Sequence, residues 1–408
     1  MKFSIELEIL IESIKTSLLG ESPEKLQAIL KNNQIDWQKF IPFVEYHSIR
    51  PVVFDAFQKM DKSLIPSEIA RYLQEYMFNQ TILNLNYSLE IGRLLQLFQA
   101  KGLRALPYKG NLFIHQFYGN KQLREVGDMD FLFHPEDAKA GLKLLLDDGY
   151  QLSVPDESFA RKLDPNALIN KILTSKGQYE VTLVKRTKEN NMQFAIDFHW
   201  EIYADFIPYK VDFERFFTTT TQQSFLGKNI DMPSTETLYF MLMSHHGGKE
   251  FWLRMKHFCD LIMFLKIHQQ SFNWQKIIDS SQKNKLNTVS MDGFYLLKKL
   301  FNVSLPAPIQ EEVNKHNFKK VEKKIFQYWE LGEKWDTLFL RLRYEEILIL
   351  SQDNGFSRKK YFKSLFQVFS TSHPLENPRI ISFPDNYPIL NFSSKVLTYF
   401  IKKFRNKP

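Results

Sequence analysis

The stretch VGDMDFLF, residues 126–133, sets two aspartates one residue apart in an otherwise apolar run. Side chains of a strand alternate between the two faces of a sheet, so Asp128 and Asp130 share one face while Met129 and Phe131 turn to the core. Burying a carboxylate costs free energy unless it is paired or binds a metal, and two close carboxylates repel one another unless a cation lies between them. A hard divalent cation, Mg²⁺ or Mn²⁺, is the natural partner of such a pair, because these ions prefer oxygen ligands. For the isolated pair of aspartates, an ordinary surface or turn position is the alternative interpretation.

A second predicted strand, FAIDFHWEI at residues 194–202, sharpens this expectation. Asp197, His199 and Glu201 share one face of it, opposite an apolar face that ends at Trp200. Three aspartates on strand faces suit phosphoryl transfer with two metal ions, in which one ion activates the attacking oxygen. His199 can orient Asp197, bind an acceptor or serve as a structural hydrogen-bonding group.

A phosphate needs positive charge and backbone N–H donors as well. In YKGNLF, residues 108–113, Gly110 stands where a strand is predicted to turn into a helix. Backbone N–H groups at such a helix start can bind an anion. Lys109 and Arg124 add positive charge on either side of the turn. Lys-Gly is a common pair, and an ordinary turn is the alternative interpretation.

The chain divides by pattern into three regions: a helical N-terminal region at 1–100, an α/β core at 101–232 and a helical C-terminal region at 233–408. The first and last regions carry apolar residues at helical spacings of three and four. The core alternates short strands with helices, and residues 179–202 read as a hairpin turning at 189–191. Pro107 confines the first strand to an edge or a strand end. The predicted fold class is α+β, a small mixed sheet with helices, flanked by helical regions.

The chain is basic, with a formal net charge of +8 and a pI near 9.1. This excess suits polyanionic partners such as nucleotides or nucleic acid, and a solvated lysine-rich surface explains it equally well. The basic segments at 315–324 and 401–408 carry no motif of a nucleic-acid-binding module. The last predicted helix is basic and amphipathic; docking on the protein body is expected rather than contact with a membrane or partner.

The single cysteine, Cys259, excludes an internal disulfide and a cysteine-rich zinc site. A reducing, cytoplasmic location is the simplest expectation. The N-terminal segment intersperses glutamates among its apolar residues and does not read as a signal peptide. No apolar run approaches the length of about 18 residues that a transmembrane helix needs.

Taken together, LPYKGNLFIHQFYGNKQLREVGDMDFLF, DDGY and AIDFHWEI resemble the uncharacterised nucleotidyltransferase family of the polymerase-β-like superfamily. The matching positions, in order, are Lys109-Gly110, Tyr118, Arg124, Gly127-Asp128-Met129-Asp130, Gly149-Tyr150 and Asp197-Phe198-His199-Trp200. One position departs from the wider superfamily, because Asn111 follows Gly110 where Ser or Gly is usual.

The likeness extends into HHGGKEFWLRMKHFCDLI at residues 245–262. It implies that His246, Arg254, Lys256 and Asp260 border a nucleotide. Lys256 and Asp260 stand at i and i+4, where a surface ion pair is the alternative. The histidine pair that opens this segment could equally be a helix end packed in the core.

The resemblance implies transfer of a nucleotidyl group from a nucleoside triphosphate, with ATP as the first candidate, to an acceptor that the sequence does not identify. The acceptor is a small molecule, a peptide or protein, or RNA. Asp128 and Asp130 would hold both metal ions. Asp197 would complete the site of the activating ion and help to deprotonate the acceptor hydroxyl. Lys109, Gly110, Asn111, Arg124, Gly127 and His199 would surround the bound nucleotide and metal. Two alternatives are an inactive nucleotide-binding module and a nucleic-acid-binding protein that uses its basic C-terminal region.

Overall fold

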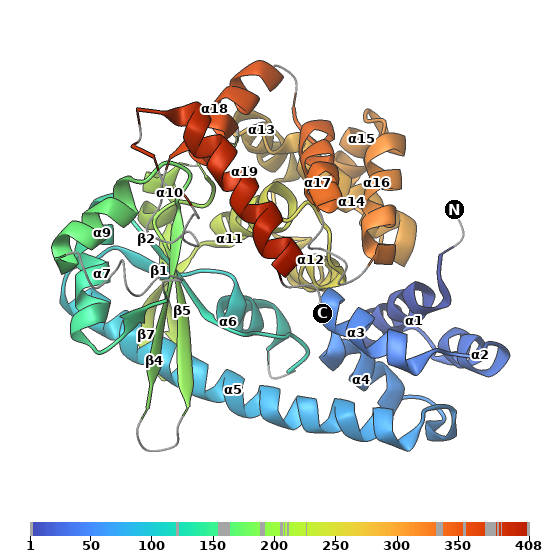
Figure 1. Ribbon diagram of the computed structural model, residues 1–408. Coiled ribbons are helices and arrows are strands. Elements are labelled where there is room, and N and C mark those ends of the chain that lie inside the picture. Colours follow the sequence, from blue (N-terminus) through green and yellow to red (C-terminus); the bar gives the residue numbers. More distant parts are fainter. Residues whose placement is uncertain are drawn as a thin grey trace. The chain divides into compact units, whose positions relative to one another are not determined.

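The computed structural model describes residues 3–119, 122–153, 164–187, 192–204, 207, 209, 212–225, 227–331, 338–353, 356–371, 381, 383, 384 and 386–405 (Figure 1). Helices dominate before and after a central group of strands, as the apolar spacings predict.

The first part of the chain forms α1 (Ile5–Ile14), α2 (Glu24–Asn32), α3 (Trp37–His47), α4 (Arg50–Gln58) and the long α5 (Ser67–Ala100). The central part forms β1 (Ala105–Pro107), α6 (Gly110–Phe113), β2 (Met129–Phe133), α7 (Ala138–Asp147), β3 (Gln151–Leu152), α9 (Pro165–Thr174), β4 (Glu180–Arg186), β5 (Gln193–His199), α10 (Phe213–Thr218), β6 (Thr220–Phe225) and β7 (Lys228–Pro233). The last part forms α11 (Thr235–Leu242), α12 (Met255–His268), α13 (Trp274–Lys283), α14 (Asn287–Phe301), α15 (Ala307–Asn314), α16 (Lys319–Leu331), α17 (Leu338–Leu350), α18 (Arg358–Ser370) and α19 (Pro388–Arg405). Short π- and 3₁₀-helical turns, η1 (Lys15–Leu19), η2 (Lys62–Leu64), η3 (Ile114–Tyr118), η4 (Pro135–Asp137) and η5 (Met243–Lys249), complete the helical elements.

The main sheet has five strands in the order β1-β2-β5-β4-β3. β2 runs parallel to β5, whereas β4 is antiparallel to both β5 and β3, so the sheet is mixed. The β4–β5 pair confirms the predicted hairpin, although residues 189–191 of its turn lie outside the described residues. β1 is an edge strand that ends at Pro107, as expected for a residue without a ladder donor. The α+β fold class is confirmed.

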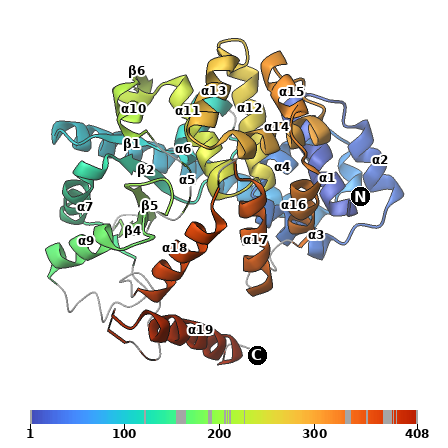
Figure 2. The ribbon, with the colours of Figure 1, turned by 90° about the horizontal axis from the view of Figure 1, so that it is seen from above.

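The apolar face of this sheet is packed with aromatic rings. Phe133 stacks on Phe198 with ring centroids 4.2 Å apart, and Phe98 of α5 meets Phe131 and Phe133 edge to face. α7 covers the same side, and Figure 2 shows α7 and α9 beside β4 and β5. Gly141 of α7 is needed at this contact, because a Cβ there would lie 2.5 Å from the ring of Phe133. The aromatic packing leaves the opposite face of β2 and β5 for polar side chains.

The chain forms two compact units. The first contains residues 1–93, 107–127 and 209–354, and the second contains residues 94–106, 128–208 and 355–408. The second unit carries the main sheet, whereas the first is built from helices together with the β6–β7 hairpin. The division at 100 and 232 stays a prediction from the sequence.

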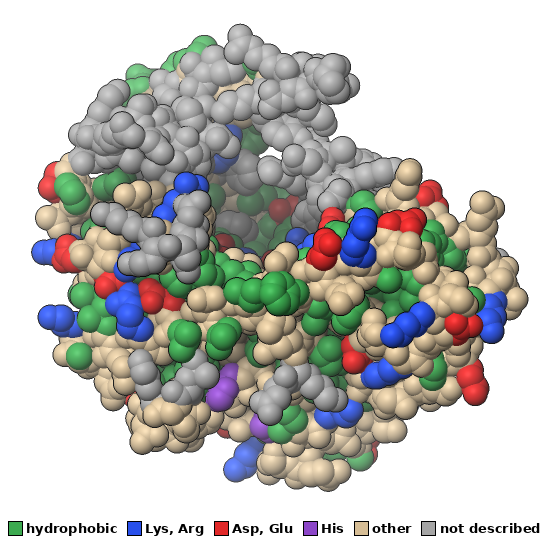
Figure 3. Space-filling model, turned by 90° about the horizontal axis from the view of Figure 1, so that it is seen from below, with side chains coloured by type: hydrophobic (Ala, Val, Ile, Leu, Met, Phe, Trp, Pro, Cys, Tyr) green, Lys and Arg blue, Asp and Glu red, His purple; other side chains and the backbone are tan. Residues whose placement is uncertain are grey.

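The middle of α5, at residues 78–89, buries two polar residues and exposes four apolar ones, although the helix also buries apolar residues such as Leu94 and Phe98. Gln80 and Asn84 are 5% and 2% exposed. The exposed apolar side chains, at 66, 45, 57 and 55%, are Phe78, Ile82, Leu85 and Leu89. Figure 3 shows the side of the molecule along which α5 runs, with apolar side chains gathered among charged ones. Hydrophobicity alone therefore does not determine which face of α5 is buried.

In the described part of the chain, no helix combines the length and apolar character needed to cross a membrane.

Candidate functional site

Polar side chains form rows across the sheet face opposite the aromatic core. The register pairs Asp130 of β2 with Asp197 of β5, and Asp197 with Thr182 of β4. One step along, the register places His199 of β5 opposite Glu180 of β4. Residues paired across neighbouring strands share a face, so all five side chains emerge on the same side. The pairing of β2 with β5 therefore places Asp130 and Asp197 next to each other on this face.

The polar side chains of this face also contact one another directly. Thr182 Oγ1 donates a hydrogen bond of 2.8 Å to Asp197 Oδ1. His199 Nε2 lies 3.4 Å from Asp130 Oδ1, and its Nδ1 lies 3.1 Å from Glu180 Oε2. Asp130 and His199 are buried, whereas Asp197 is half-buried. Asp197 therefore forms the open edge of the group, where a ligand can reach it.

One ligand atom from each of Asp130, Asp197 and His199 lies within 4.8 Å of the other two. Two carboxylates suit Mg²⁺ or Mn²⁺, and the imidazole can act as a third ligand or hold Asp130 in place. The residues present thus fit a divalent ion. Asp128 precedes β2, is half-buried and does not belong to this group of three, so its role as a ligand stays a prediction.

Glu201 follows β5 on the same alternation. The backbone N–H groups of Trp200 and Glu201 both donate to the carbonyl of Tyr179. Burial raises the pKa of the half-buried Glu201 carboxyl to about 7. A carboxyl group with this pKa can exchange protons near neutral pH. Glu201 is therefore the second candidate, after Asp197, for the group that takes the proton from an acceptor hydroxyl.

The Lys109–Gly110 turn has an unusual backbone. Lys109 has φ 44° and ψ −138°, and Gly110, the first residue of α6, has φ 39°. A positive φ is ordinary for glycine but strained for lysine. Strained residues gather at functional sites because the surrounding structure must hold them in place. The backbone at Lys109 therefore differs from that of an ordinary turn, and the role of Lys109 in binding stays a prediction.

Arg124 lies buried against Asp260 of α12. Its Nε is 2.9 and 3.1 Å from the two carboxylate oxygens, and Nη2 is 3.1 Å from Oδ2. Its Nη1 donates to the carbonyl of Gly110 at 3.2 Å. The sequence suggested a phosphate-binding cation at this position. In the structure the guanidinium links the Lys109–Gly110 turn to α12.

Asp260 is the centre of this buried cluster. It also accepts a hydrogen bond of 2.8 Å from Tyr118 Oη, and His246 Nε2 lies 2.8 Å from its Oδ2. Burial alone would raise the pKa of Asp260, but Arg124 and His246 hold it well below its usual range. Tyr118, Arg124 and Asp260 all belong to the pattern found in the sequence, and the structure brings them into one network.

Lys256 does not form the surface ion pair considered from its spacing. Among the described residues no carboxylate lies within ion-pair distance of its amine, although Asp260 is one turn away. Burial, together with the charges of Arg254 and Arg124, lowers the pKa of Lys256 to about 8. Lys256 thus carries an amine whose charge an anionic ligand would stabilise.

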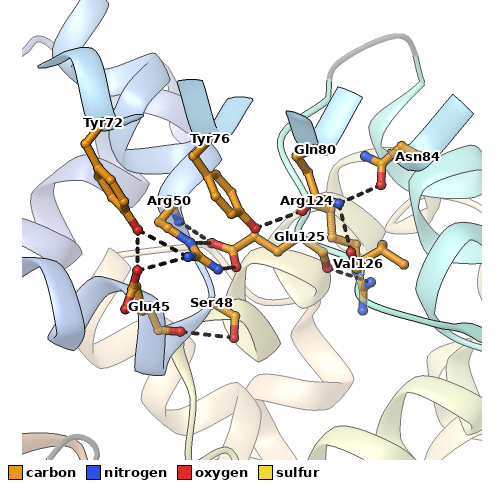
Figure 4. Close-up of polar contacts among 10 residues, drawn as sticks. All are labelled: Glu45, Ser48, Arg50, Tyr72, Tyr76, Gln80, Asn84, Arg124, Glu125 and Val126. Carbon is orange, nitrogen blue, oxygen red and sulfur yellow. Dashed lines mark hydrogen bonds and ion pairs between the residues drawn. The ribbon is translucent and has the colours of Figure 1, made fainter. Parts of the chain in front are cut away.

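The loop that leads to Asp128 is anchored residue by residue, a feature that sequence reasoning missed. Arg50 binds both carboxylate oxygens of Glu125, with Nε 3.1 Å from Oε1 and Nη2 2.7 Å from Oε2 (Figure 4). Gln80 Nε2 donates to the carbonyl of Val126 at 2.8 Å. Further hydrogen bonds join Asn84 to Gln122 and Tyr87 to the carbonyl of Gly127.

These contacts explain why the middle of α5 buries polar residues, because their side chains bind the loop that precedes the aspartates. Gln80, Asn84 and Tyr87 recur at spacings of four and three, which is the one sequence signal that could have revealed this face.

Comparison with known proteins identifies the family. No curated protein matches the chain. A family model described as uncharacterised nucleotidyltransferase matches residues 33–302, which include the sheet, the three aspartates and the Arg124–Asp260 cluster. The chain therefore belongs to this family of nucleotidyltransferases.

Proposed function

We propose that this protein transfers the nucleotidyl group of a nucleoside triphosphate to an acceptor hydroxyl, with Mg²⁺ or Mn²⁺ bound at Asp128, Asp130 and Asp197. ATP is the first candidate for the triphosphate. The observation that supports this most is the grouping of Asp130, Asp197 and His199 within 4.8 Å on one sheet face of a nucleotidyltransferase. When bound, the metal ions supply charge for the phosphates and lower the pKa of the attacking hydroxyl.

The protein's own groups have separate roles in this proposal. Asp197, on the open edge, holds the ion that activates the acceptor and receives its proton. Thr182 fixes Asp197 by its 2.8 Å hydrogen bond, and His199 steadies Asp130. Both contacts orient the aspartates before a ligand arrives.

The phosphates are bound, in this proposal, by the turn at Lys109, Gly110 and Asn111 and by cationic side chains of the 254–256 segment. Arg124 and Asp260 act indirectly, because their buried pair fixes the turn. Lys256 contributes a positive charge that a bound phosphate would stabilise, since the pKa of its amine is lowered to about 8 in the free protein.

The direct test of activity uses α-labelled nucleoside triphosphates. Each is incubated with the protein, Mg²⁺ or Mn²⁺ and a cell extract, and the fraction that gains label is isolated. Label on an acceptor, with release of pyrophosphate, is the expected result. Binding of the triphosphate without any labelled product would instead indicate an inactive nucleotide-binding module.

Metal-dependent stabilisation is the first expected consequence. At 100 times its Kd, ATP with Mg²⁺ should raise the free energy of unfolding by about 2.7 kcal/mol. Asp130→Ala and Asp128→Ala should each abolish this gain and leave the free protein folded, because removing one of several clustered carboxylates relieves repulsion. Thermal melts with and without EDTA measure the effect. A melting shift equal to that of the parent in either variant would show that the substituted aspartate does not bind the metal.

The strained turn gives a second expectation. Lys109→Gly removes a strain of about 1–3 kcal/mol and adds a glycine entropy cost of about 0.5–1 kcal/mol. The free energy of unfolding should therefore stay level or rise, whereas affinity for ATP should fall much more than affinity for adenosine. Urea unfolding and calorimetric titration measure the two effects.

Lys109→Ala is the matched control for this turn, because it removes the charge and keeps a strained non-glycine residue. It should lose ATP affinity equally and gain no stability. Equal losses for ATP and adenosine would place Lys109 in the scaffold or near the base instead.

A further inference from the structure

The π-helical turn η5 carries two adjacent histidines whose roles the proposed reaction does not define. His246 is fully buried, and His245 is 7% exposed. π-Helical turns are rare and occur frequently at functional sites. Both histidines lie in the same compact unit as Asp260 and Lys109, so their contacts can be described together.

The contacts form a chain from Asp260 to His245. His246 Nε2 lies 2.8 Å from Asp260 Oδ2, and His246 Nδ1 lies 2.9 Å from His245 Nδ1. Asp260 is ionised and can only accept, so Nε2 of His246 must donate. Burial lowers the pKa of His246, because desolvation disfavours the charged imidazolium, and the nearby charges of Arg124 and Lys256 lower it further.

A neutral imidazole has one N–H, and this fact fixes the tautomers along the chain. Since Nε2 of His246 holds the proton, its Nδ1 accepts, and Nδ1 of His245 must donate. Burial also lowers the pKa of His245, to which the charges of Lys109, His246, Lys249 and His257 contribute. His245 is then neutral, and its Nε2 presents a lone pair.

That lone pair is open to a ligand. Within the described part of the chain, no group donates a hydrogen bond to Nε2 of His245, and this nitrogen is not fully buried. It therefore reaches solvent. The ring meets Tyr108 edge to face at 6.2 Å, next to Lys109, and the charges of Lys109 and Lys249 act on it. The two lysines attract an anion. The lone pair of Nε2 repels a phosphate oxygen, however, so Nε2 binds a group of the ligand that donates a hydrogen bond.

We propose that His245 Nε2 accepts a hydrogen bond from a hydroxyl of a phosphorylated ligand, and that Asp260 and His246 hold His245 in the tautomer that allows this. A nucleotide brings both groups, phosphate for the lysines and a ribose hydroxyl for His245, so the inference rests on the proposed function. Asp260 and His246 are positioning residues, and His245 is a ligand-binding residue.

The tautomers can be measured without any ligand. Long-range ¹H–¹⁵N NMR of the protein with ¹⁵N-labelled histidine should show His246 protonated at Nε2 and His245 protonated at Nδ1. His246→Phe should remove the preference at His245, because no acceptor then faces Nδ1. A proton on Nε2 of His245 in the free parent would overturn the proposal.

The ligand contact is tested with ATP, 2′-deoxy-ATP and 3′-deoxy-ATP in the presence of Mg²⁺. Loss of the contacting hydroxyl should weaken binding to the parent by about tenfold, as expected for one hydrogen bond. His245→Phe should bind all three equally, and His245→Gln, whose amide oxygen can accept, should recover part of the preference.

His257→Phe is the matched control. His257 stacks on His246 with ring centroids 4.6 Å apart but stands outside the chain of hydrogen bonds, so its variant should keep the preference for ATP. Equal binding of all three nucleotides by the parent, or an unchanged preference in His245→Phe, would overturn the ligand contact. A parent that binds no nucleotide would contradict the proposed function, and the NMR experiment would still test the tautomers.

Discussion

Asp260→Asn should lower the free energy of unfolding by about 3–5 kcal/mol, the cost of breaking a buried ion pair. Asp260 is fully buried and accepts from Arg124 and Tyr118, with His246 2.8 Å away. An amide in its place leaves the Arg124 guanidinium buried without a counter-charge. Urea unfolding of the ligand-free protein measures the loss.

The Asp260 prediction has two controls. Asp279→Asn changes an exposed aspartate on α13 and should alter the free energy of unfolding by no more than about 0.5 kcal/mol. Arg124→Met combined with Asp260→Leu should lose less than the sum of the single changes, because neither charge is then left alone. A loss below about 1 kcal/mol for Asp260→Asn would contradict the structural role given to the pair.

Asp197→Asn should lower turnover by about 10²-fold or more while leaving ATP affinity within a few-fold of the parent. Asp197 lies on β5, whereas Asp128 and Asp130 lie at β2, so the nucleotide–metal complex keeps two carboxylates. The lost interaction grows as the acceptor oxygen becomes an alkoxide-like nucleophile, and such interactions lower kcat and kcat/KM together.

The fold should survive this change. Asparagine keeps the shape of aspartate and an oxygen that can accept from Thr182 Oγ1. The rate of label transfer from α-labelled ATP to the acceptor fraction measures turnover. Asp147→Asn, on the exposed end of α7, is the control and should transfer label at the parental rate. Near-parental turnover in Asp197→Asn would exclude the three-aspartate mechanism and make Glu201, with its pKa of about 7, the next residue to test.

The stretch at 126–133 and the strand at 194–202 were enough to predict the sheet face that carries the candidate site. Alternation along a strand depends only on local geometry, so the shared face of Asp197 and His199 follows from the sequence. The pairing of β2 with β5 does not follow from local geometry, because it joins residues 67 positions apart. Only that pairing brings Asp130 next to Asp197 and adds His199 to the group, with Asp128 just before the strand.

Arg124 shows the limit of reasoning from charge. A lone cation near a glycine turn indicates a phosphate site, and the sequence contains nothing that pairs it with a carboxylate 136 positions away. The middle of α5 shows a related limit, since Gln80 and Asn84 are buried by their hydrogen bonds to a loop, which the hydrophobicity of the helix does not predict.

The sequence by itself determined the α+β class, the strand faces and the residue types of the candidate site, because each depends on local periods and on the chemistry of single side chains. The tertiary structure alone decided which charges neutralise one another, which nitrogen of each histidine can hold a proton, and which aspartates meet. Those outcomes depend on packing between distant segments, where burial makes every unpaired polar group costly and so selects one arrangement.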